Sequence, residues 1–320
     1  MVDPILALVG GETLLGADLR DMAAERIPSA RIHLVGSEEQ DTAILTEQGG
    51  EAVVMTGLDA DRLAGARVVL LAGSQAASRK ALDLLKDASP RPAILDLTHA
   101  LDDAPEARLL APWVLPDKPP AGAGPIVIPH PAAIVVARIL RALQAQHRVV
   151  RAVAQVLVPA SERGRMGVNE LQEQTVSLLS FQPPVMDVFG GQLSFNLLAS
   201  GVAETERRVE SHIATLLAGG PVIPMPSMRF LQAGVMHGYS FSLWVELDNP
   251  EGVMESLKTA GLDVWPDDPP HVVGIAGQDG VSIGRIERDR NNARAVWIWA
   301  VADQFRVACE NAIVLAEAAL

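Results

Sequence analysis

Near its start the chain reads Ile5-Leu-Ala-Leu-Val-Gly-Gly-Glu-Thr-Leu-Leu-Gly16, an apolar segment that passes through a glycine-rich turn into a stretch with helical spacing. Gly10 and Gly16 hold the first and last positions of a G-x-x-G-x-x-G pattern, and Thr13 stands at the middle position. Glycines in such a turn let the backbone approach a pyrophosphate, and the first turn of the helix offers N–H groups. Threonine is β-branched where close approach favours glycine, so a tight strand–helix connection without a nucleotide is an equally good interpretation.

Short apolar segments alternate with amphipathic ones throughout the first third of the chain. The apolar segments are rich in β-branched residues and predict buried strands at 5–10, 31–35, 51–55, 67–71 and 92–96. Helical spacing lies between them at 14–25 and 75–86. Strands that are apolar on both faces and separated by helices indicate a parallel sheet covered on both sides. The predicted fold class is therefore α/β, with a doubly wound, Rossmann-like sheet.

A proline-rich segment at 112–125 predicts a domain boundary, because it cannot form regular structure. Beyond it we expect longer strands at 149–158 and 237–247, helices near 168–179, 204–217 and 250–260, further strands at 271–275, 281–288 and 295–301, and a last helix at 304–320. Residues 237–247 alternate with period two, as in an antiparallel sheet with two distinct faces. We therefore predict a Rossmann-like domain of residues 1–125, joined by the helix 304–320, and an α+β domain of residues 126–303.

The composition is that of a folded chain: of 320 residues, 49% are hydrophobic and 20% are charged. No apolar run approaches the roughly 18 residues of a membrane-spanning helix, and no basic segment precedes an apolar one as in a signal peptide. The net charge of −13 argues against a nucleic acid partner. The single cysteine, Cys309, excludes an internal disulfide, and the seven histidines form no H-x-x-H or H-x-x-x-H pair, so we expect no metal site. These features predict a cytoplasmic protein.

Several segments match, in order along the chain, the motifs of one enzyme family. They are the opening turn, Leu71-Ala-Gly-Ser-Gln-Ala-Ala-Ser78, Glu170-Leu-Gln-Glu-Gln-Thr175, Phe195-Asn196, Val281-Ser-Ile-Gly-Arg-Ile-Glu-Arg-Asp289 and Ala295-Val-Trp-Ile-Trp-Ala-Val-Ala-Asp303. They resemble the family motifs G-x-T-G-x-V-G, S-A-G-G, E-L-x-x-Q-T, F-N, V-G-R-I-R-x-D and L-W-L-W-V-V-A-D-N. Over essentially its whole length, the chain resembles an aspartate-semialdehyde dehydrogenase.

The resemblance implies an NAD(P)-binding Rossmann-like domain and an α+β dimerisation domain, with a homodimer and the strand of Trp297 and Trp299 in the second domain. The family reductively dephosphorylates aspartyl phosphate with NADPH: a cysteine thiolate attacks the acyl carbon, a histidine manages the protons, and arginines hold the carboxylate and phosphate. By resemblance, NADP or NAD would bind through a weakened turn and would not be required for the fold. The implied cofactor-binding residues are Gly10, Thr13, Leu14, Gly16, Ser37, Gly73 and Ser74.

The family's nucleophile is missing from this sequence. Its P-N-C-x-T motif corresponds to Ile128-Pro-His-Pro-Ala-Ala-Ile134, where Pro131 stands in place of the cysteine. His130 would give an unstable acyl adduct, and the simpler interpretation is that His130-Pro131 begins a helix, since proline is well tolerated in a first turn. Cys309 lies on the apolar stripe of the last helix and reads as a core thiol.

The resemblance places His237 at the family's catalytic histidine, within Met236-His-Gly-Tyr-Ser-Phe-Ser242. The family's groups that hold the anionic substrate are changed here to Val158, Val235, Asp102 and Glu206, while Ser161 and Glu204 match the family. Carboxylates in such places repel a phosphate, and valine cannot imitate an arginine that forks onto a carboxylate.

A Ser-His-Asp arrangement could recruit Ser161 or Ser240 with His237, but it has little support because the sequence has no G-x-S-x-G turn. Two hypotheses of function remain. The better supported is a catalytically inactive paralogue that keeps the fold and acts as a nucleotide- or metabolite-binding or assembly protein, its small-molecule ligand being left open. The alternative is an active NAD(P)-dependent semialdehyde dehydrogenase with an altered substrate. Position 131 separates the two, because thiol chemistry needs cysteine there.

Overall fold

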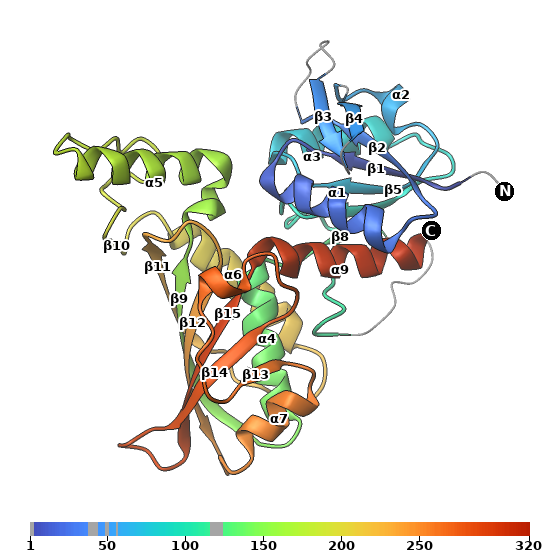
Figure 1. The fold of residues 1–320 in the computed structure, drawn as a ribbon. Coiled ribbons are helices and arrows are strands. Elements are labelled where there is room, and N and C mark those ends of the chain that lie inside the picture. The colour runs from blue at the N-terminus through green and yellow to red at the C-terminus, as the bar shows by residue number, and fades with distance from the viewer. Residues whose placement is uncertain (1–2, 38–43, 49–50, 56, 116–123) are drawn as a thin grey trace. The chain divides into compact units, whose positions relative to one another are not determined.

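The computed structural model describes residues 3–37, 44–48, 51–55, 57–115 and 124–320, and for 44–48 and 51–54 it describes the backbone alone. The chain divides into two compact units, Met1–His130 with Ala308–Leu320, and Pro131–Val307 (Figure 1). The divisions fall at the start of α4 (Pro131–Gln144) and within α9 (Gln304–Ala319). The domain boundary after residue 125 stays a prediction.

The first unit is built on a six-stranded sheet in the order β2-β1-β5-β6-β8-β7. Its strands are β1 (Ile5–Val9), β2 (Arg31–Val35), β5 (Ala66–Leu71), β6 (Ala93–Asp96), β7 (Arg108–Leu109) and β8 (Ile126–Val127), and every neighbouring pair runs parallel. Successive residues of a strand face opposite sides, so a strand buried along its length needs cover on both faces. Residues 6–9 and 68–71 are 0% exposed. The parallel α/β sheet predicted from the sequence is confirmed.

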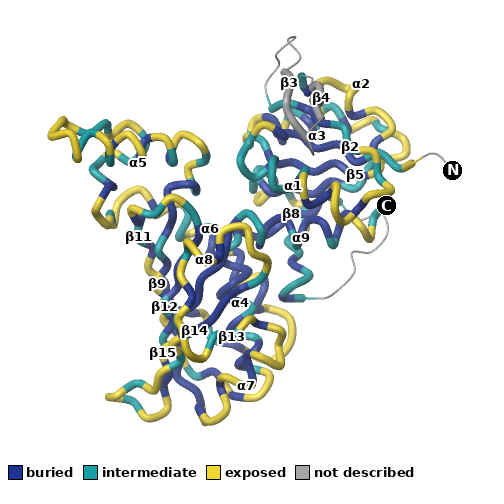
Figure 2. The backbone as a smooth tube through the Cα atoms, viewed as in Figure 1, coloured by how far each residue is buried: buried dark blue, intermediate teal, exposed yellow. Residues whose placement is uncertain are grey.

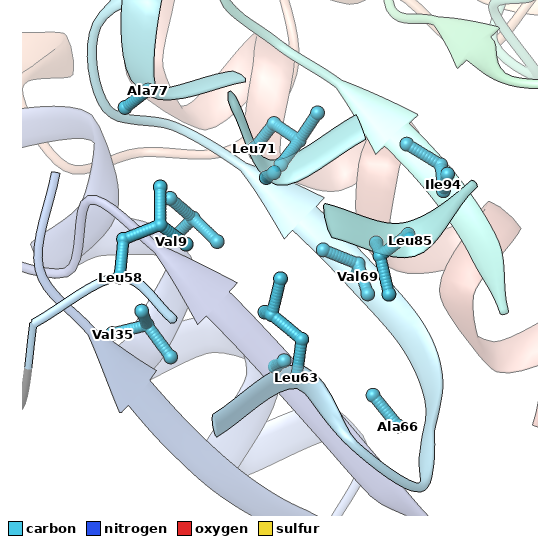
Figure 3. Close-up of a cluster of buried hydrophobic side chains, with 12 residues drawn as sticks. Val9, Val35, Leu58, Leu63, Ala66, Val69, Leu71, Ala77, Leu85 and Ile94 are labelled. Atoms are coloured by element: carbon cyan, nitrogen blue, oxygen red, sulfur yellow. The ribbon is translucent and has the colours of Figure 1, made fainter. Parts of the chain in front are cut away.

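Helix α3 (Gln75–Leu85) lies over one face of this sheet. Its Ala77 and Leu85 pack in a cluster of buried side chains with Val69 and Leu71 of β5, and Leu63 of α2 (Ala60–Leu63) joins them (Figure 3). Helix α1 (Leu14–Arg26) packs against β1 and β2. Burying a leucine or valine side chain contributes about 1.5–3 kcal/mol. The cluster therefore fixes α3, and with it the turn after β5, against the sheet.

The predicted strand at 51–55 exists, but it does not belong to the parallel sheet. This strand, β4 (Glu51–Met55), pairs antiparallel with β3 (Ile44–Gln48) in a separate two-stranded sheet. Gly49 and Gly50 stand between the two strands in the sequence, and a two-residue glycine connection is typical of a β-hairpin. The prediction that residues 51–55 form a strand of the parallel sheet was therefore wrong. An apolar run by itself does not show which strand it pairs with, and here the two glycines before it are the signal for a hairpin partner.

The second unit contains a seven-stranded mixed sheet in the order β10-β11-β9-β12-β15-β14-β13. Its strands are β9 (Val149–Val158), β10 (Leu197–Leu198), β11 (Ser227–Ala233), β12 (Tyr239–Leu247), β13 (Asp263–Trp265), β14 (Ser282–Arg288) and β15 (Ala295–Ala302). The central strand β12 runs antiparallel to both of its neighbours, β9 and β15. Phe241, Leu243 and Val245 of β12 are 0% exposed, which agrees with the predicted period-two alternation.

Helices α6 (Ala203–Leu217) and α7 (Val253–Thr259) both pack against α4, and α4 also packs on β9. Figure 2 shows α4 almost entirely buried, whereas α5 (Gly164–Leu179) extends away from the sheet and is largely exposed. The predicted strand at 271–275 is wrong, since Val272–Ile275 forms the short helix α8. His271 begins this helix by accepting a hydrogen bond on Nδ1 from the N–H of Gly274 over 3.1 Å, and histidine as a cap was not anticipated from the sequence.

Candidate functional site

The glycine-rich turn between β1 and α1 packs directly against the turn between β5 and α3. Gly10 has a φ of +89°, and a Cβ added there would lie 2.3 Å from the Cα of Gly73. A Cβ on Gly16 would lie 2.0 Å from the carbonyl oxygen of Gly10. Both positions therefore exclude a side chain, which explains the two glycines of the pattern without reference to a ligand.

Thr13, at the middle position of the pattern, is the N-cap of α1. Its hydroxyl oxygen accepts from the N–H of Gly16 over 2.9 Å and lies 3.0 Å from the Gly10 carbonyl oxygen and 2.9 Å from that of Ala72, to which the O–H donates. The side chain thus ties the helix start to the ends of β1 and β5. The first N–H groups of α1, beginning at Leu14, have no acceptor within the helix and suit an anion.

The remaining predicted cofactor residues lie at the same edge of the sheet. Ser37 follows β2, while Gly73 and Ser74 follow β5, and β1 lies between these two strands. Ser74 caps α3 by accepting from the N–H of Ala77 over 3.1 Å. The structure therefore brings the seven predicted residues to the carboxyl edge of three adjacent strands, where α/β sheets bind nucleotides. These residues fit a dinucleotide, and its binding stays a prediction.

A buried carboxylate that the sequence did not draw attention to, Asp96, lies at the end of β6. It is 0% exposed and accepts hydrogen bonds from the N–H and O–H of Thr98, at 2.8 and 2.7 Å, and from the N–H of Leu101 at 2.9 Å. The pKa of Asp96 lies above its ordinary value, chiefly because the carboxylate is buried. The hydrogen bonds from Thr98 and Leu101 act to lower this pKa, and the Asp102 carboxylate acts to raise it. Asp96 holds the segment that carries Asp102, one of the predicted substrate positions that no longer bears a cation.

None of the three residues Pro131, His130 and Cys309 supplies an accessible nucleophile. Pro131 is the first residue of α4, as the helix-start interpretation predicts. His130 is 2% exposed and stacks on the ring of His99, with centroids 5.6 Å apart. Cys309 is 0% exposed, and its Sγ lies 4.0 Å from the carbonyl oxygen of Leu15, as expected of a core thiol.

His237 lies in a hydrogen-bonded cluster in the second unit. It precedes β12, while Ser161 follows β9 and Asp303 follows β15. Because β9 and β15 both run antiparallel to β12, their ends meet the start of β12. His237 Nε2 lies 2.8 Å from Asp303 Oδ2, and its Nδ1 lies 3.1 Å from Ser161 Oγ. Gln304, the first residue of α9, donates its side-chain N–H to Ser161 Oγ over 2.6 Å.

The cluster occupies both nitrogens of the His237 ring. In the neutral ring, Gln304 donates to Ser161, Ser161 O–H donates to Nδ1, and Nε2–H donates to Asp303. Gln304 also accepts from the N–H of Gly238 over 3.1 Å, and the Phe305 ring lies 5.0 Å from the imidazole. In this arrangement Nε2 faces Asp303, so a substrate could offer a proton to Nδ1 only by way of the Ser161 hydroxyl or by taking its place.

The electrostatics of the cluster depend on Asp303, which the sequence analysis quoted only as the end of a motif. Its side chain is 1% exposed. Burial acts to raise the pKa of Asp303, but the hydrogen bond and attraction of His237, with the N–H of Gly277 at 2.8 Å, outweigh burial and hold this pKa below its ordinary value. The carboxylate is thus kept ionised at its place beside the ring.

Ser161, His237 and Asp303 form the chain of contacts that a Ser-His-Asp hydrolase would need, which the sequence analysis considered and set aside. Ser161 is 2% exposed, and Gln304 already donates to its Oγ. A nucleophile must reach the carbonyl carbon of its substrate, and this hydroxyl has almost no accessible surface. Ser240, the other candidate, is 7% exposed and pairs within the sheet.

The positions of the second unit that the resemblance assigns to substrate binding lie on two strand ends and on α6. The N–H of Ala160 donates to the carbonyl oxygen of Val235, and that of Ser161 donates to Met236, so the segments after β9 and β11 are joined. Val158 at the end of β9 is buried and carries no polar side-chain atom. Glu204 and Glu206 lie in the first turn of α6, where Glu204 pairs with Arg208 four residues on.

Two further expectations concern absences. Among the described residues, no three His, Cys, Asp or Glu side chains are grouped so that they could hold a metal ion. Every helix in the described part of the chain is too short or too polar to span a lipid bilayer.

Comparison with known proteins gives concordant matches. The model of the family described as "Semialdehyde dehydrogenase, dimerisation domain" matches residues 140–307. A USG-1 protein homolog of Azotobacter vinelandii is 31% identical over 98% of this chain and 96% of its own length. An aspartate-semialdehyde dehydrogenase of Prochlorococcus marinus is 25% identical over 98% of this chain and 94% of its own length. The solved structure of a probable aspartate-semialdehyde dehydrogenase from Pseudomonas aeruginosa superposes with a TM-score of 0.86 at 26% identity, covering 98% of this chain and 97% of that one.

Proposed function

Since the chain belongs to the semialdehyde dehydrogenase family, with aspartate-semialdehyde dehydrogenases among its relatives, we propose that it is a non-catalytic member of that family. In this proposal it keeps the family's fold, binds a nicotinamide dinucleotide or related metabolite at the carboxyl edge of the parallel sheet, and assembles as a cytoplasmic homodimer. The single observation that carries the loss of catalysis is the state of His237.

A general base must reach, with a ring nitrogen, the proton that it removes. Nε2 of His237 lies 2.8 Å from Asp303 and Nδ1 lies 3.1 Å from Ser161, which Gln304 holds in turn. To serve a substrate, the ring would have to break one of these contacts, and breaking the Nε2 contact would leave the buried Asp303 carboxylate without it. Asp303 would keep the N–H donors of Gly277, Phe305 and Arg306, and the lost hydrogen bond to a charged group would cost about 1.5–3 kcal/mol. The histidine that the resemblance retains is therefore a structural residue in this proposal.

The missing thiol agrees with this interpretation. Pro131 has no nucleophilic atom, and the sole cysteine of the sequence, Cys309, is fully buried in α9. Covalent catalysis through a thioester has no route without an accessible thiolate. Val158 and Val235 offer a carboxylate or phosphate neither charge nor donors.

The nucleotide part of the proposal rests on the turn between β1 and α1. A bound nicotinamide dinucleotide would supply or accept hydride in a working member of the family. In this chain, the first turn of α1 would bind the pyrophosphate through its N–H groups, and the absence of acidic residues from that turn favours an anion there. Gly10, Gly16 and Gly73 would keep the backbones of the two turns close enough to approach it.

The homodimer part of the proposal rests on one face of the seven-stranded sheet. Val153, Trp244 and Trp297 are register partners on β9, β12 and β15, so their side chains lie in one row. Val153 and Trp297 are each 40% exposed, whereas Leu243, on the opposite face, is fully buried. A row of large apolar side chains exposed in a dimerisation domain suits a second copy of the chain.

Val153→Glu should yield monomers, and Val273→Glu, which changes an exposed valine of α8, should leave the dimer intact. Sedimentation velocity at micromolar concentration distinguishes monomers from dimers.

Two measurements on the purified protein test the function. Calorimetric titration with NAD⁺, NADP⁺ and NADPH should detect binding of at least one nucleotide. Initial rates of aspartate-semialdehyde oxidation with nucleotide and phosphate should stay at background. Turnover of aspartate semialdehyde at about 1 s⁻¹ or more, a rate typical of enzymes, would overturn the proposal in favour of an active dehydrogenase. Turnover of another aldehyde at such a rate would favour the alternative, an active dehydrogenase with an altered substrate.

A further inference from the structure

The end of strand β2 meets the glycine-rich turn through a carboxylate. Val9 and Val35 are register partners, and the N–H of Gly10 donates to the carbonyl oxygen of Val35 over 2.8 Å. Beyond this point the Ser37 N–H donates to Glu12 Oε1 over 3.0 Å, and the Ser37 O–H donates to the same oxygen. Glu12, in the middle of the turn, therefore reaches across the gap between two adjacent strands.

We infer that Glu12 makes the proposed nucleotide site select NAD(H) and reject NADP(H). This inference rests on the proposed function, because it needs a dinucleotide at the turn. In dinucleotide-binding sheets, the groups that follow the second strand face the ribose next to the adenine. An acidic group there accepts a hydrogen bond from the ribose 2′-hydroxyl, while a 2′-phosphate needs donors or cations.

Both donors that Ser37 offers at this position are used by a carboxylate. A phosphate monoester carries about −1.5 to −2 charges near neutral pH and would have to displace Glu12 from two hydrogen bonds or lie beside its negative charge. The ribose hydroxyl of NAD⁺ is a donor and meets no such conflict, since the carboxylate can accept from it.

The surroundings hold this arrangement in place. A Cβ on Gly73 would lie 2.8 Å from the Cβ of Ser37, so the segment after β5 packs tightly behind the serine. Thr13, next to Glu12, is fixed by its bonds to Gly10 and Ala72. Glu12 itself is exposed, so water and salt screen its charge, and we expect a selectivity of about tenfold to a hundredfold rather than complete exclusion.

Calorimetric titration of three proteins with NAD⁺ and with NADP⁺ tests the inference. The wild type should bind NAD⁺ about tenfold or more tightly than NADP⁺, and Glu12→Gln should tighten NADP⁺ about tenfold while changing NAD⁺ less than about threefold, because glutamine keeps an acceptor and loses the charge. Glu25→Gln is the matched control: it removes the same charge from an exposed position near the far end of α1 and should change neither affinity. The wild-type preference should also shrink as salt is raised from low to high concentration.

Each outcome bears on the inference. Equal binding of the two nucleotides by the wild type, or an unchanged NADP⁺ affinity in Glu12→Gln, overturns the selectivity alone and leaves the nucleotide site in place. Failure of all three proteins to bind either nucleotide overturns the proposed nucleotide site and the inference with it. Matching thermal unfolding of the three proteins ensures that the comparison is made between folded molecules.

Discussion

The glycine-rich turn of the first unit and the His237 cluster of the second have changed in opposite ways relative to the family motifs. The turn has lost a glycine of its pattern to Thr13, yet the threonine is absorbed by bonds to Gly10, Gly16 and Ala72. The cluster has kept its histidine, yet both nitrogens of that ring are committed to neighbouring side chains.

The contrast shows that residue identity and residue availability are separate properties. At the turn, the substituted side chain faces the protein, so the N–H groups at the start of α1 remain suited to an anion. At the cluster, the imidazole of His237 is hydrogen-bonded to other side chains of the protein. The presence of a histidine at this position therefore says little about proton transfer to or from a substrate. The following changes would break or sharpen this contrast.

Restoring the thiol should not restore catalysis. Pro131→Cys would provide the nucleophile at the start of α4, but His237 would still be bonded to Asp303 and Ser161, and Val158 and Val235 would still offer no anchor. Correct positioning can contribute about 7–11 kcal/mol to lowering a barrier. We expect initial rates with aspartate semialdehyde, nucleotide and phosphate to remain at background.

Alkylation of Pro131→Cys provides the control for that experiment. The introduced thiol should react with iodoacetamide in the folded protein, while the buried Cys309 should not. A reactive thiol without turnover supports the committed state of His237. Efficient turnover of the single variant would show that the ring can leave its partners, and the contrast between the two regions would fail.

Gly16→Ala should destabilise the first unit. The new methyl group would lie 2.0 Å from the Gly10 carbonyl oxygen, which is backbone and cannot rotate away. Overpacking of this kind costs about 1–3 kcal/mol or more of the free energy of unfolding. Gly11→Ala is the matched control, since its nearest neighbour is the flexible end of Leu34 at 3.4 Å, and we expect a change within about 0.5 kcal/mol. Urea unfolding measures both, and equal losses would refute the close approach of Gly16 to the Gly10 carbonyl oxygen within the turn.

Asp303→Asn should destabilise the cluster in a pH-dependent way. The pKa of Asp303 lies below its ordinary value of 3.8, so its ionised form stabilises the fold above that pH, and this contribution is lost as the pH falls through the lowered pKa. The variant should lose about 1–3 kcal/mol of the free energy of unfolding at neutral pH, and the difference from wild type should shrink in acid.

Asp279→Asn is the control for Asp303→Asn. Asp279 pairs with Arg306 at the surface, where its side chain is half exposed, and exposed pairs contribute about 0–1 kcal/mol. Denaturant curves at neutral pH and near the ordinary aspartate pKa give the comparison. A pH-independent loss in Asp303→Asn would contradict the role assigned to its charge.

The difference between prediction and structure follows from sequence distance. Strands β1 and β12 could be predicted because burial on both faces, or on alternate residues, leaves a local pattern. Ser161, His237 and Asp303 meet only because β12 lies between β9 and β15, and no local spacing encodes that strand order. Asp303 and Gln304 form a polar pair directly after the buried strand that ends in the motif Ala295–Asp303. This pair was the signal available in the sequence, but nothing in its spacing connects it with His237. Glu12 was also visible in the turn, but its contact with Ser37 depends on the register of β1 and β2.

The smallest expected effect concerns Thr13 itself. Thr13→Gly would restore the glycine of the nucleotide-binding pattern, and Thr13→Ser would keep the hydroxyl that caps α1. Loss of an N-cap hydroxyl costs about 0.5–2 kcal/mol, less when glycine replaces it, so we expect Thr13→Gly to lose about 0.5–1 kcal/mol of the free energy of unfolding and Thr13→Ser to match the wild type. Nucleotide affinity should change less than about threefold in both, because the N–H groups that would hold the pyrophosphate belong to the backbone of α1 rather than to this side chain. Combined denaturant curves and titrations test both halves. A large gain in nucleotide affinity in Thr13→Gly alone would mean that the threonine obstructs the turn, and the contrast between the two regions would fail.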